Sequence, residues 1–515
     1  MKSIKLQQSS LREASSFKPA PKMDACGLKF PWSLNVGAWN FFRRHPSLSL
    51  RLQRNAGESG SAFIIVLWIA FGLVSLGLYF GNSMVLELRA SDNRASGLAA
   101  EQAIEGALRY VNSILGNQAT YGSNGYVPDV GGYLSQAVPV GEAHFWLIGR
   151  DTNAPSGPGQ LSFGLIDEAS KLNLNTASSN MLFVLTESLP RANQDVVAGI
   201  LDWRSTNGGN YQTYYATRPQ PYQSKNGPFE TVDELRLVYG ADMDTVVGED
   251  RNGNGVLDPS EADGSKNGQL EPGLLEYVTV YSREPNTQTN GSARVNIQTV
   301  TGTTGPLPSL LQNAFGSSRA NQIMVNLGLL SSGPVGGANR GRMATPVAMF
   351  RSPLQFYQLS RMTSDEFAQI ANNITLTNGP YILGRVNVNT ASLAVLSCLP
   401  GLDSNPDLAQ TLVDYRQTNP DKLTSVAWLV DALGQSNSSV LSTLMASDCV
   451  TAQSYQFSAD IAALGPNGRG YRRVRVVFDT CNGSPKIVYR QDLTQLGWAL
   501  GKDVRDKFVL AKATP

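Results

Sequence analysis

Residues 62 to 80 read AFIIVLWIAFGLVSLGLYF, which is 19 positions without a charged side chain. This length reaches the threshold for a transmembrane helix, because about 20 apolar residues at ~1.5 Å each cross a hydrocarbon core of about 30 Å. Arg43, Arg44, Arg51 and Arg54 precede the stretch, and few basic residues follow it closely. Since basic flanks are retained in the cytosol, we expect the N-terminus to stay inside and the rest of the chain to be exported.

The residues after position 80 distinguish a retained anchor from a cleaved signal peptide. A signal peptide requires a small-residue cleavage site after its apolar core, and GNSMVLELRAS at 81–91 offers no clear one. Instead, apolar residues recur at spacings of three and four, in the pattern of an amphipathic helix: Ala99, Ala103, Ile104, Ala107, Leu108, Val111, Ile114 and Leu115. The pattern predicts one helix from about residue 61 to 115, ended by Gly116. A plain signal-anchored periplasmic protein is the alternative.

Composition argues against several functional classes. The 515 residues suffice for two to four domains, and 42 Lys and Arg balance 41 Asp and Glu, so no net field attracts nucleic acid. The only histidines are His45 and His144, and no cysteine pair has metal-ligand spacing. We find no phosphate-binding loop, no G-x-S-x-G motif and no histidine near a nucleophile. The sequence therefore predicts a protein that is not an enzyme.

The four cysteines leave one question open. Cys26 precedes the apolar stretch, and Cys398, Cys449 and Cys481 follow it. In an oxidising compartment Cys449 and Cys481, which flank an expected sheet region, could form a disulfide. The other interpretation is three separate buried thiols.

A repeat organises the exported region. LNLNTAS at 172–178 recurs as VNVNTAS at 386–392, ILDWRSTN at 200–207 as LVDYRQTN at 412–419, and FETVDELRLVYG at 229–240 as LTSVAWLVDALG at 423–434. A weaker middle copy begins at RVNIQT (294–299) and runs through FRSPLQFYQLSRM (350–362). Each copy predicts a strand, an Asn-x-Asn-Thr turn, a helix pair and a further helix near a glycine. The charged pairs Asp202 with Arg204 and Asp414 with Arg416 are expected to bind neighbouring loops rather than to catalyse a reaction.

Further strands are expected on either side of the repeat. HFWLIGR (144–150) and LSFGLIDE (161–168) are typical strands joined by a turn at NAPSGPG (153–159). RRVRVVFDT (472–480) and KIVYRQD (486–492) are expected to complete an antiparallel sheet, and LEYVTVYS (275–282) has the composition of another strand.

One motif indicates a metal. In DRNGNGVLDPSE, the positions 1, 3, 5, 7, 9 and 12 of a calcium loop are filled by Asp250, Asn252, Asn254, Val256, Asp258 and Glu261, with Gly255 at the sharp turn. Calcium is a hard cation that prefers oxygen ligands, and one tight loop can supply them, so we expect a structural calcium site. An ordinary Asn/Gly-rich turn is the alternative. A partial copy at Asp263, Ser265, Asn267, Gly268 and Glu271 lacks the twelfth acid, since Leu274 stands there.

Several of these stretches resemble a known family. The run ESG-SAFIIVLW at 58–68, followed in order by GLIDEASKLNLNTA (164–177), ILDW (200–203) and NGPFETVDELRLVYG (226–240), is similar to the general secretion pathway protein K family, minor pseudopilins of the type IV pilin superfamily. The resemblance implies that prepilin peptidase cuts between Gly60 and Ser61. Ordinary pilins carry Glu as the fifth mature residue, where this chain has Ile65. A subunit without that acid cannot pair with the terminal amine of a subunit above it, which implies a place at the tip.

The resemblance also implies an architecture. It is an α+β fold in which a long pilin-like N-terminal helix packs on a small antiparallel sheet, with inserted SAM-like or helix-hairpin-helix-like helical domains. The expected parts are a cytosolic leader at 1–60, the N-terminal helix at 61–116, pilin-like strands with the first helical domain and the calcium loop at 117–300, the weaker middle repeat at 301–385, and the second helical repeat with the C-terminal strands at 386–515. Two departures are the long leader and the absence of acidic residues from Ser205 to Gln212.

The expected function follows from the same resemblance. It is a non-enzymatic tip subunit of the type II secretion pseudopilus, single-pass in the bacterial inner membrane with a periplasmic C-terminal domain. Its expected partners are other minor pseudopilins, the major pseudopilin, the inner-membrane assembly platform and prepilin peptidase, without nucleic acid. The alternatives are a minor pilin of a type IV pilus and an exported DNA-binding protein that uses helix-hairpin-helix units such as LPGL at 399–402.

Overall fold

The computed structural model describes residues 59–120, 127–152, 160–207, 209–288, 290–299, 304–330 and 350–510. The chain divides into two compact units, Met1–Leu78 and Tyr79–Pro515. Most of the expected leader, Cys26 and the NAPSGPG turn lie outside the described residues.

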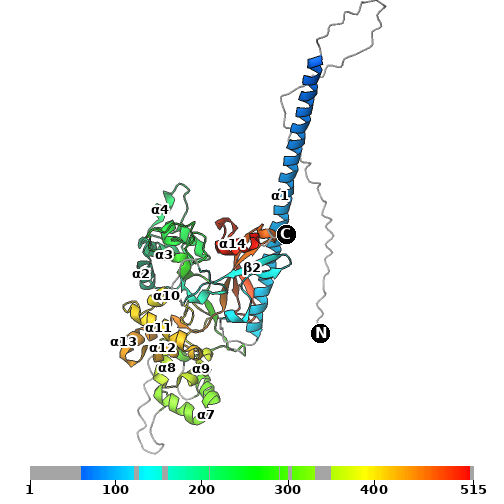
Figure 1. Cartoon of the computed structure of the whole chain (residues 1–515). Helices are drawn as coiled ribbons and strands as arrows, with labels where there is room; N and C mark the ends of the chain where they lie inside the picture. Colours follow the sequence, from blue (N-terminus) through cyan, green and yellow to red (C-terminus); the bar gives the residue numbers. More distant parts are fainter. Residues whose placement is uncertain are drawn as a thin grey trace, which may run out of the picture. The chain divides into compact units, whose positions relative to one another are not determined.

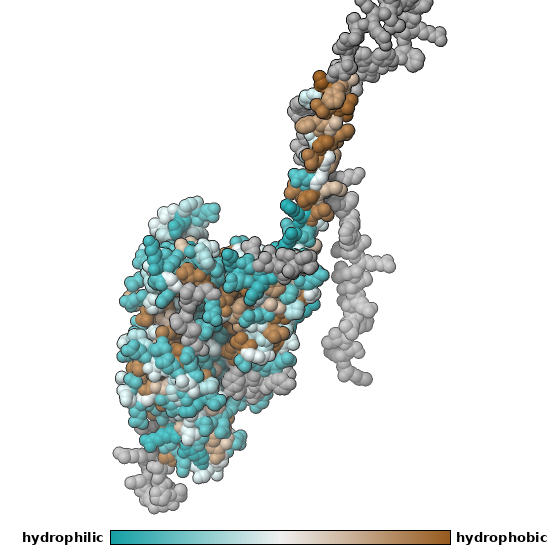
Figure 2. All heavy atoms as spheres, viewed as in Figure 1, coloured by the Kyte–Doolittle hydropathy of each residue, from teal (hydrophilic) through white to brown (hydrophobic). Residues whose placement is uncertain are grey.

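The first described element is the long helix α1 (Ser59–Thr120). It is long and apolar enough to cross a membrane, with a mean hydropathy of 2.4 in its most apolar window. Figure 2 shows apolar side chains covering its N-terminal stretch. From Ser96 onward one face is buried, through Ala100, Ala103, Ile104, Ala107, Leu108, Val111 and Leu115, which confirms the amphipathic pattern.

Gly116 does not end this helix, contrary to the prediction. The helix continues to Thr120, and Gly116 lies against the ring of Pro485. A glycine inside a helix costs only about 1 kcal/mol, and no proline follows to stop the helix, so packing can carry it one turn further.

A six-stranded antiparallel sheet carries the second half of α1. The strand order is β1-β2-β12-β13-β14, with β3 also pairing to β12. The bounds are β1 Val138–Val140, β2 Ala143–Ile148, β3 Ile166–Asp167, β12 Gln456–Leu464, β13 Arg472–Asp479 and β14 Lys486–Asp492. The strands expected at 144–150, 472–480 and 486–492 are confirmed. The one expected at 161–168 shortens to β3, because Gly164 has a φ of 151° and only Phe163 before it bridges to Ile148.

The two faces of β2 pack against different helices. Phe145 and Leu147 join the buried face of α1, whereas Trp146 and Ile148 pack on the other side against α14 (Gly501–Leu510). This alternation is the two-residue period of a strand covered on both faces. The protein therefore has the expected α+β pilin-like fold (Figure 1).

Three helical segments are inserted between β3 and β12, and each is bounded by a two-residue parallel strand pair. The pairs are β4 (Leu172–Asn173) with β5 (Val278–Thr279), β7 (Val295–Asn296) with β8 (Ile374–Thr375), and β10 (Val386–Asn387) with β11 (Val450–Thr451). The Asn of each first strand accepts a hydrogen bond from the backbone N–H two residues later, at 2.9, 2.9 and 3.0 Å. The Thr of each second strand does the same, at 3.1, 3.3 and 3.2 Å. The sequence repeat is thus also a repeat of hydrogen bonds.

Each segment contains short helices. The first segment contains α2 (Ser179–Ser188), α3 (Asp195–Arg204), α4 (Gln212–Ala216), η3 (Val232–Leu237), α5 (Met243–Val246) and α6 (Leu274–Tyr277). The middle segment contains α7 (Pro306–Asn326), α8 (Pro353–Ser360) and α9 (Ser364–Ile370). The third segment contains α10 (Leu393–Ser397), α11 (Pro406–Thr418), α12 (Trp428–Leu433) and α13 (Ser438–Ala446). Within α7, Gly316 has a φ of 75° and breaks the helix into a pair.

Two predictions in the first segment need correction. FETVDELRLVYG forms the single 3₁₀ element η3, started by a capping box between Thr231 and Glu234, rather than an α-helix. LEYVTVYS splits into α6 and β5, because the partner strand β4 has only two residues to pair.

Candidate metal centre and neighbouring cavity

The candidate calcium loop, residues 250–261, lies between α5 and α6. The carboxylate of Asp250 accepts the backbone N–H groups of Asn254 at 3.0 Å and of Gly255 at 2.8 Å. Gly255 has a φ of 83°, which favours glycine, and a Cβ there would lie 2.8 Å from Nε of Arg150. The loop therefore turns sharply around Asp250, as the sequence pattern requires.

Three further side chains of the motif converge within the turn. The amides of Asn252 and Asn254 both donate to Oδ2 of Asp258, at 2.6 and 2.9 Å. The carboxylate of Glu261 accepts the backbone N–H groups of Asn252 at 3.0 Å and Asp258 at 3.1 Å, which closes the loop. Oδ1 of Asn252 is buried without a hydrogen-bond partner.

The carboxylates of this loop are held in an unfavourable setting. Burial raises the pKa of Asp250, although the guanidinium of Arg150 lowers it in part. Burial likewise raises the pKa of Glu261. Among the described residues, no three His, Cys, Asp or Glu side chains form a metal-binding group by themselves. An ion at this loop therefore needs the amide oxygens of the two asparagines as well as the carboxylates, and the orphaned Asn252 oxygen fits that requirement.

The partial copy of the motif adopts the same hydrogen bonds. In residues 263–271, Asp263 accepts the N–H of Gly268 at 2.9 Å, and Asn267 donates to Glu271 at 3.0 Å. Oδ1 of Asn267 accepts the N–H of Gln269 at 2.7 Å, as Oδ1 of Asn254 accepts that of Val256 at 2.9 Å. The two loops are therefore structural copies.

Glu249 replaces the acid that the second loop lacks at its twelfth position. Its carboxylate accepts the N–H of Gly264 at 2.7 Å and that of Glu271 at 3.2 Å. It is only 2% exposed, and Arg191 pairs with it at 3.2 Å. The sequence motif did not include Glu249, because the motif is read along one loop and Glu249 stands before the start of the first loop.

The outer side of the first loop contacts three arginines of the sheet, which the sequence also did not reveal. Arg150, directly after β2, donates to the carbonyls of Gly253 at 2.9 Å and Asn254 at 3.2 Å. Arg473 of β13 donates to the carbonyls of Gly253, at 2.7 Å, and Asn252. Arg475 reaches Gly253 at 3.4 Å. More than 100 residues separate each arginine from the loop, so no local pattern could predict the contacts.

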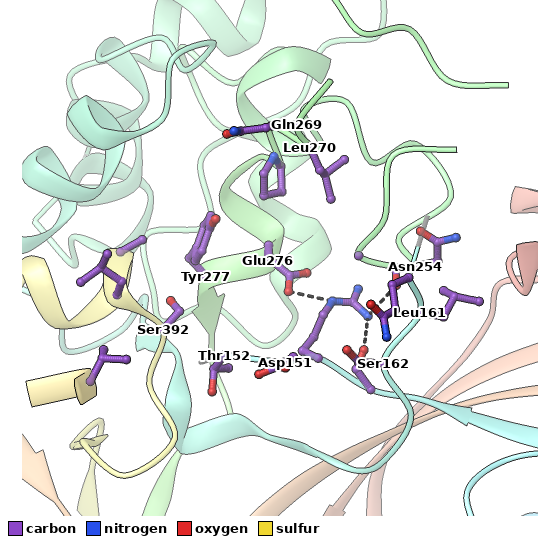
Figure 3. Close-up of a pocket in the computed structure, with 18 of the residues that line it drawn as sticks. Asp151, Thr152, Leu161, Ser162, Asn254, Gln269, Leu270, Glu276, Tyr277 and Ser392 are labelled. Carbon is purple, nitrogen blue, oxygen red and sulfur yellow. Dashed lines mark hydrogen bonds and ion pairs between the residues drawn. The ribbon is translucent and has the colours of Figure 1, made fainter. Parts of the chain in front are cut away.

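A cavity of about 730 Å³ lies beside this contact, where the sheet, the first segment and the third segment meet. Arg150 lines the cavity and pairs with Glu276 at 2.7 Å, and Figure 3 shows Glu276 among the side chains around the cavity. The remaining wall is mixed, with Thr152, Ser162 and Gln269 beside apolar Leu161 and Leu270.

The repeated arginines bind loops, as expected. Arg204 donates to the carbonyls of Leu174 and, at 2.7 Å, Ala177. Arg416 donates to the corresponding carbonyls, Val388 at 2.9 Å and Ala391 at 2.7 Å. In both repeats the arginine of the second helix therefore fixes the turn after the first strand.

The remaining predicted residues have separate environments. Gly60 and Ser61 lie in the first turn of α1. Cys449 and Cys481 are free thiols in this structure. Cys449 contacts Ser447 at 3.0 Å, whereas Cys481 accepts a hydrogen bond from Gln456 at 3.1 Å. Each thiol thus packs in its own polar environment.

The hairpin that carries LPGL is not arranged for phosphate binding. The backbone N–H of Gly401, which a phosphate would need, donates to the carboxylate of Asp403 at 3.1 Å. The same carboxylate accepts the amide of Asn180 at 2.7 Å. An anion already occupies this position, so a nucleic-acid phosphate would be repelled.

Comparison with known proteins gives a family match for one part of the chain. The family model described as type II secretion system (T2SS), protein K, matches residues 167–247, which begin in β3 and stop directly before the first loop. A chain from the crystal structure of the GspK-GspI-GspJ complex of the enterotoxigenic Escherichia coli type 2 secretion system is 10% identical, with 79% of this chain and 98% of that chain covered and a TM-score of 0.35. No curated protein matches the sequence. Across the first helical segment, the chain is therefore similar to protein K of the type II secretion system.

Proposed function

We propose that this protein is a non-enzymatic minor pseudopilin that occupies the tip of the type II secretion pseudopilus and nucleates its assembly for protein export. The observation that carries the proposal is α1, whose uncharged stretch at 62–80 has Ile65 where a filament-forming pilin has an acid. A carboxylate within lipid requires a partner, which in a fibre is the terminal amine of the next subunit. Without the acid, this subunit cannot pair with the terminal amine of a subunit above it, and it therefore occupies the tip of the filament.

The anchor and the family indicate the setting and the partners. A single apolar helix suits single-pass insertion in the inner membrane, with the unit from Tyr79 onward in the periplasm. The protein of the Escherichia coli structure is complexed with GspI and GspJ, so the corresponding minor pseudopilins are the partners we propose here. The major pseudopilin, the assembly platform and prepilin peptidase complete the set.

The processing step tests the anchor. We expect the mature chain to begin at Ser61 in wild-type cells and to keep its leader in cells without prepilin peptidase, as measured by mass spectrometry of the N-terminus. A mature chain that begins beyond Tyr79 would show that the apolar stretch is a removed signal peptide. That result would refute the proposal.

Labelling tests the place at the tip. We expect antibodies against the periplasmic unit to mark one end of sheared pseudopili. Labels repeated along the shaft would contradict the tip position even if processing at Ser61 is correct.

We also propose that the first loop holds a structural calcium ion. Asp250, Asn252, Asn254, Asp258 and Glu261 would supply side-chain oxygens, and Val256 its carbonyl. Oδ1 of Asn252 is buried without a hydrogen-bond partner, and Oδ1 of Asn254 accepts one hydrogen bond, from Val256, so each oxygen has a lone pair to offer to the ion. Calcium would neutralise the buried carboxylates and tighten the loop, and exported proteins meet enough calcium for a weak site.

The second loop is the weaker candidate for calcium. It has the same hydrogen bonds, and Glu249 closes it, but Arg191 already neutralises this carboxylate. We therefore expect it to fill only after the first loop.

The melting temperature tests the ion. Asp250→Ala with Glu261→Ala should lower it more when calcium is present than with a chelator, because the variant loses the stabilisation by the ion in addition to the bonds within the loop. Asp129→Ala, which removes the cap of a distant 3₁₀ turn, is the matched control and should lower it equally with and without calcium. Equal melting of wild type with calcium and with a chelator would remove the calcium proposal.

A further inference from the structure

We infer that Arg150, Arg473 and Arg475 are positioning residues for calcium: they hold the first loop in its receptive shape and thereby link ion binding to the docking of the first helical segment on the sheet. The inference rests on the calcium site proposed above. It goes further in assigning a role to residues outside the loop.

One backbone carbonyl is the centre of the arrangement. Oxygen of Gly253 accepts hydrogen bonds from Arg473 at 2.7 Å, Arg150 at 2.9 Å and Arg475 at 3.4 Å. The neighbouring carbonyls of Asn252 and Asn254 accept from Arg473 and Arg150. Three consecutive peptide groups of the loop are thus bound by the sheet.

These contacts fix which way the loop faces. With the carbonyls of residues 252–254 turned toward the sheet, the N–H groups of Asn254 and Gly255 point inward to Asp250. The side chains of Asn252 and Asn254 then meet at Asp258. A loop released from the arginines would have to order these groups on binding, which costs about 1–2 kcal/mol per residue.

The arginines are themselves held rigidly. Asp460 of β12 binds Nε of Arg473 at 2.7 Å and Nη2 of Arg475 at 2.8 Å, and Glu276 binds Nε of Arg150 at 2.7 Å. Neither Asp460 nor Arg473 has any exposed side-chain surface. The guanidinium planes are therefore fixed before the loop meets them, and their double donors match the adjacent carbonyls.

Thermodynamic reciprocity gives the consequence. If the arginines raise the affinity of the loop for calcium, calcium must strengthen the contact between loop and sheet by the same factor. Arg473 and Arg475 belong to β13, so their bonds to Gly253 are also where the first segment meets that strand. Calcium would thus stabilise the docking as well as the loop.

Conservative variants test the inference on the full chain in detergent. Arg150→Lys and Arg473→Lys keep the charge and lose the fork of donors, so we expect the calcium dissociation constant to rise about 10-fold or more, as when outer-shell partners of metal ligands are changed. Arg475→Lys, with the longest bond, should have a smaller effect. The constant is measured by calorimetric titration with calcium chloride.

The matched control is Arg385→Lys. Arg385 is also buried, and its ion pairs are with Asp448 at 2.7 Å and Glu284 at 3.5 Å rather than with the loop. It should lower the melting temperature but change the dissociation constant less than 2-fold. Hydrogen exchange gives a second measurement: calcium should slow exchange in the loop and in β13 of the wild type, but only in the loop of Arg473→Lys.

The outcomes separate the two claims. If the wild type binds calcium and the folded Arg150 and Arg473 variants bind it equally well, the positioning role is wrong and the calcium site stands. If the wild type binds no calcium, the site is wrong and the inference falls with it. A 10-fold loss in the control as well would show general destabilisation and also overturn the inference.

Discussion

Removing the charge of Asp460 should destabilise the sheet, because this buried carboxylate pairs with two arginines. Its carboxylate accepts two bonds from Arg473, at 2.7 and 2.8 Å, and one from Arg475 at 2.8 Å. Burial alone would raise the pKa of Asp460, but the two arginines hold it well below its usual range. The carboxylate is therefore ionised at neutral pH.

The magnitude follows from this burial. Asp460→Asn keeps the size but leaves the guanidinium of Arg473, which has no exposed surface, without a counter-charge. Breaking one partner of a buried pair costs about 3–5 kcal/mol. Arg475 contributes less to the loss, because its side chain is 27% exposed and water can solvate it.

A double-mutant cycle isolates the pair. Arg473→Met alone should also be costly, whereas the double variant should lose about 2–3 kcal/mol less than the sum of the single losses. The assay is urea unfolding of the full chain in detergent at pH 7, followed by tryptophan fluorescence. Asp414→Asn, an exposed aspartate on α11, is the control and should change the free energy of unfolding by about 0.5 kcal/mol or less. A loss below about 1 kcal/mol for Asp460→Asn, or additivity of the two single losses, would refute the reasoning.

Three further changes are informative. Burial raises the pKa of Asp167 to about 6 from 3.8. Its contribution to the free energy of unfolding is therefore present below pH 4 and falls by about 3 kcal/mol as the pH rises through 6. In Asp167→Asn, the free energy of unfolding should no longer show this fall between pH 4 and pH 7. Gly199→Ala should cost about 1–3 kcal/mol in urea unfolding, because its Cβ would overlap the carbonyl oxygen of Tyr239, whereas Gly132→Ala meets nothing and should be neutral. Arg416→Met should cost about 2–4 kcal/mol in the same assay, since two loop carbonyls lose their donor, and a neutral result would show that water replaces it.

Local patterns account for what the sequence could predict. The period of three and four in residues 99–115 predicted the buried face of α1, because this pattern reports one element against one core. The recurrence of Asn-x-Asn-Thr predicted the repeat for the same reason, since each Asn bonds only two residues away.

The features that the sequence could not predict depend on partners far along the chain. Gly116 was expected to end α1, yet packing against Pro485, far along the chain, lets the helix continue. In the candidate site the loop ligands follow one another and were recognisable, whereas Glu249 and the sheet arginines approach from outside that window. Cys449 and Cys481 are both near the end of the chain, but proximity in sequence did not decide whether their thiols meet.

The two ends of the middle segment lie next to each other. β6 (Arg283–Pro285) and β9 (Tyr381–Leu383) pair antiparallel, and Asn286 next to them donates its N–H to the carbonyl of Pro380 at 3.0 Å. The residues between β6 and β9 therefore form an insertion whose two ends are in contact. A tight turn joining β6 to β9 would form an ordinary hairpin and leave the pilin-like body closed. A change in the length of the middle segment should therefore leave this strand pair and the six-stranded sheet in place.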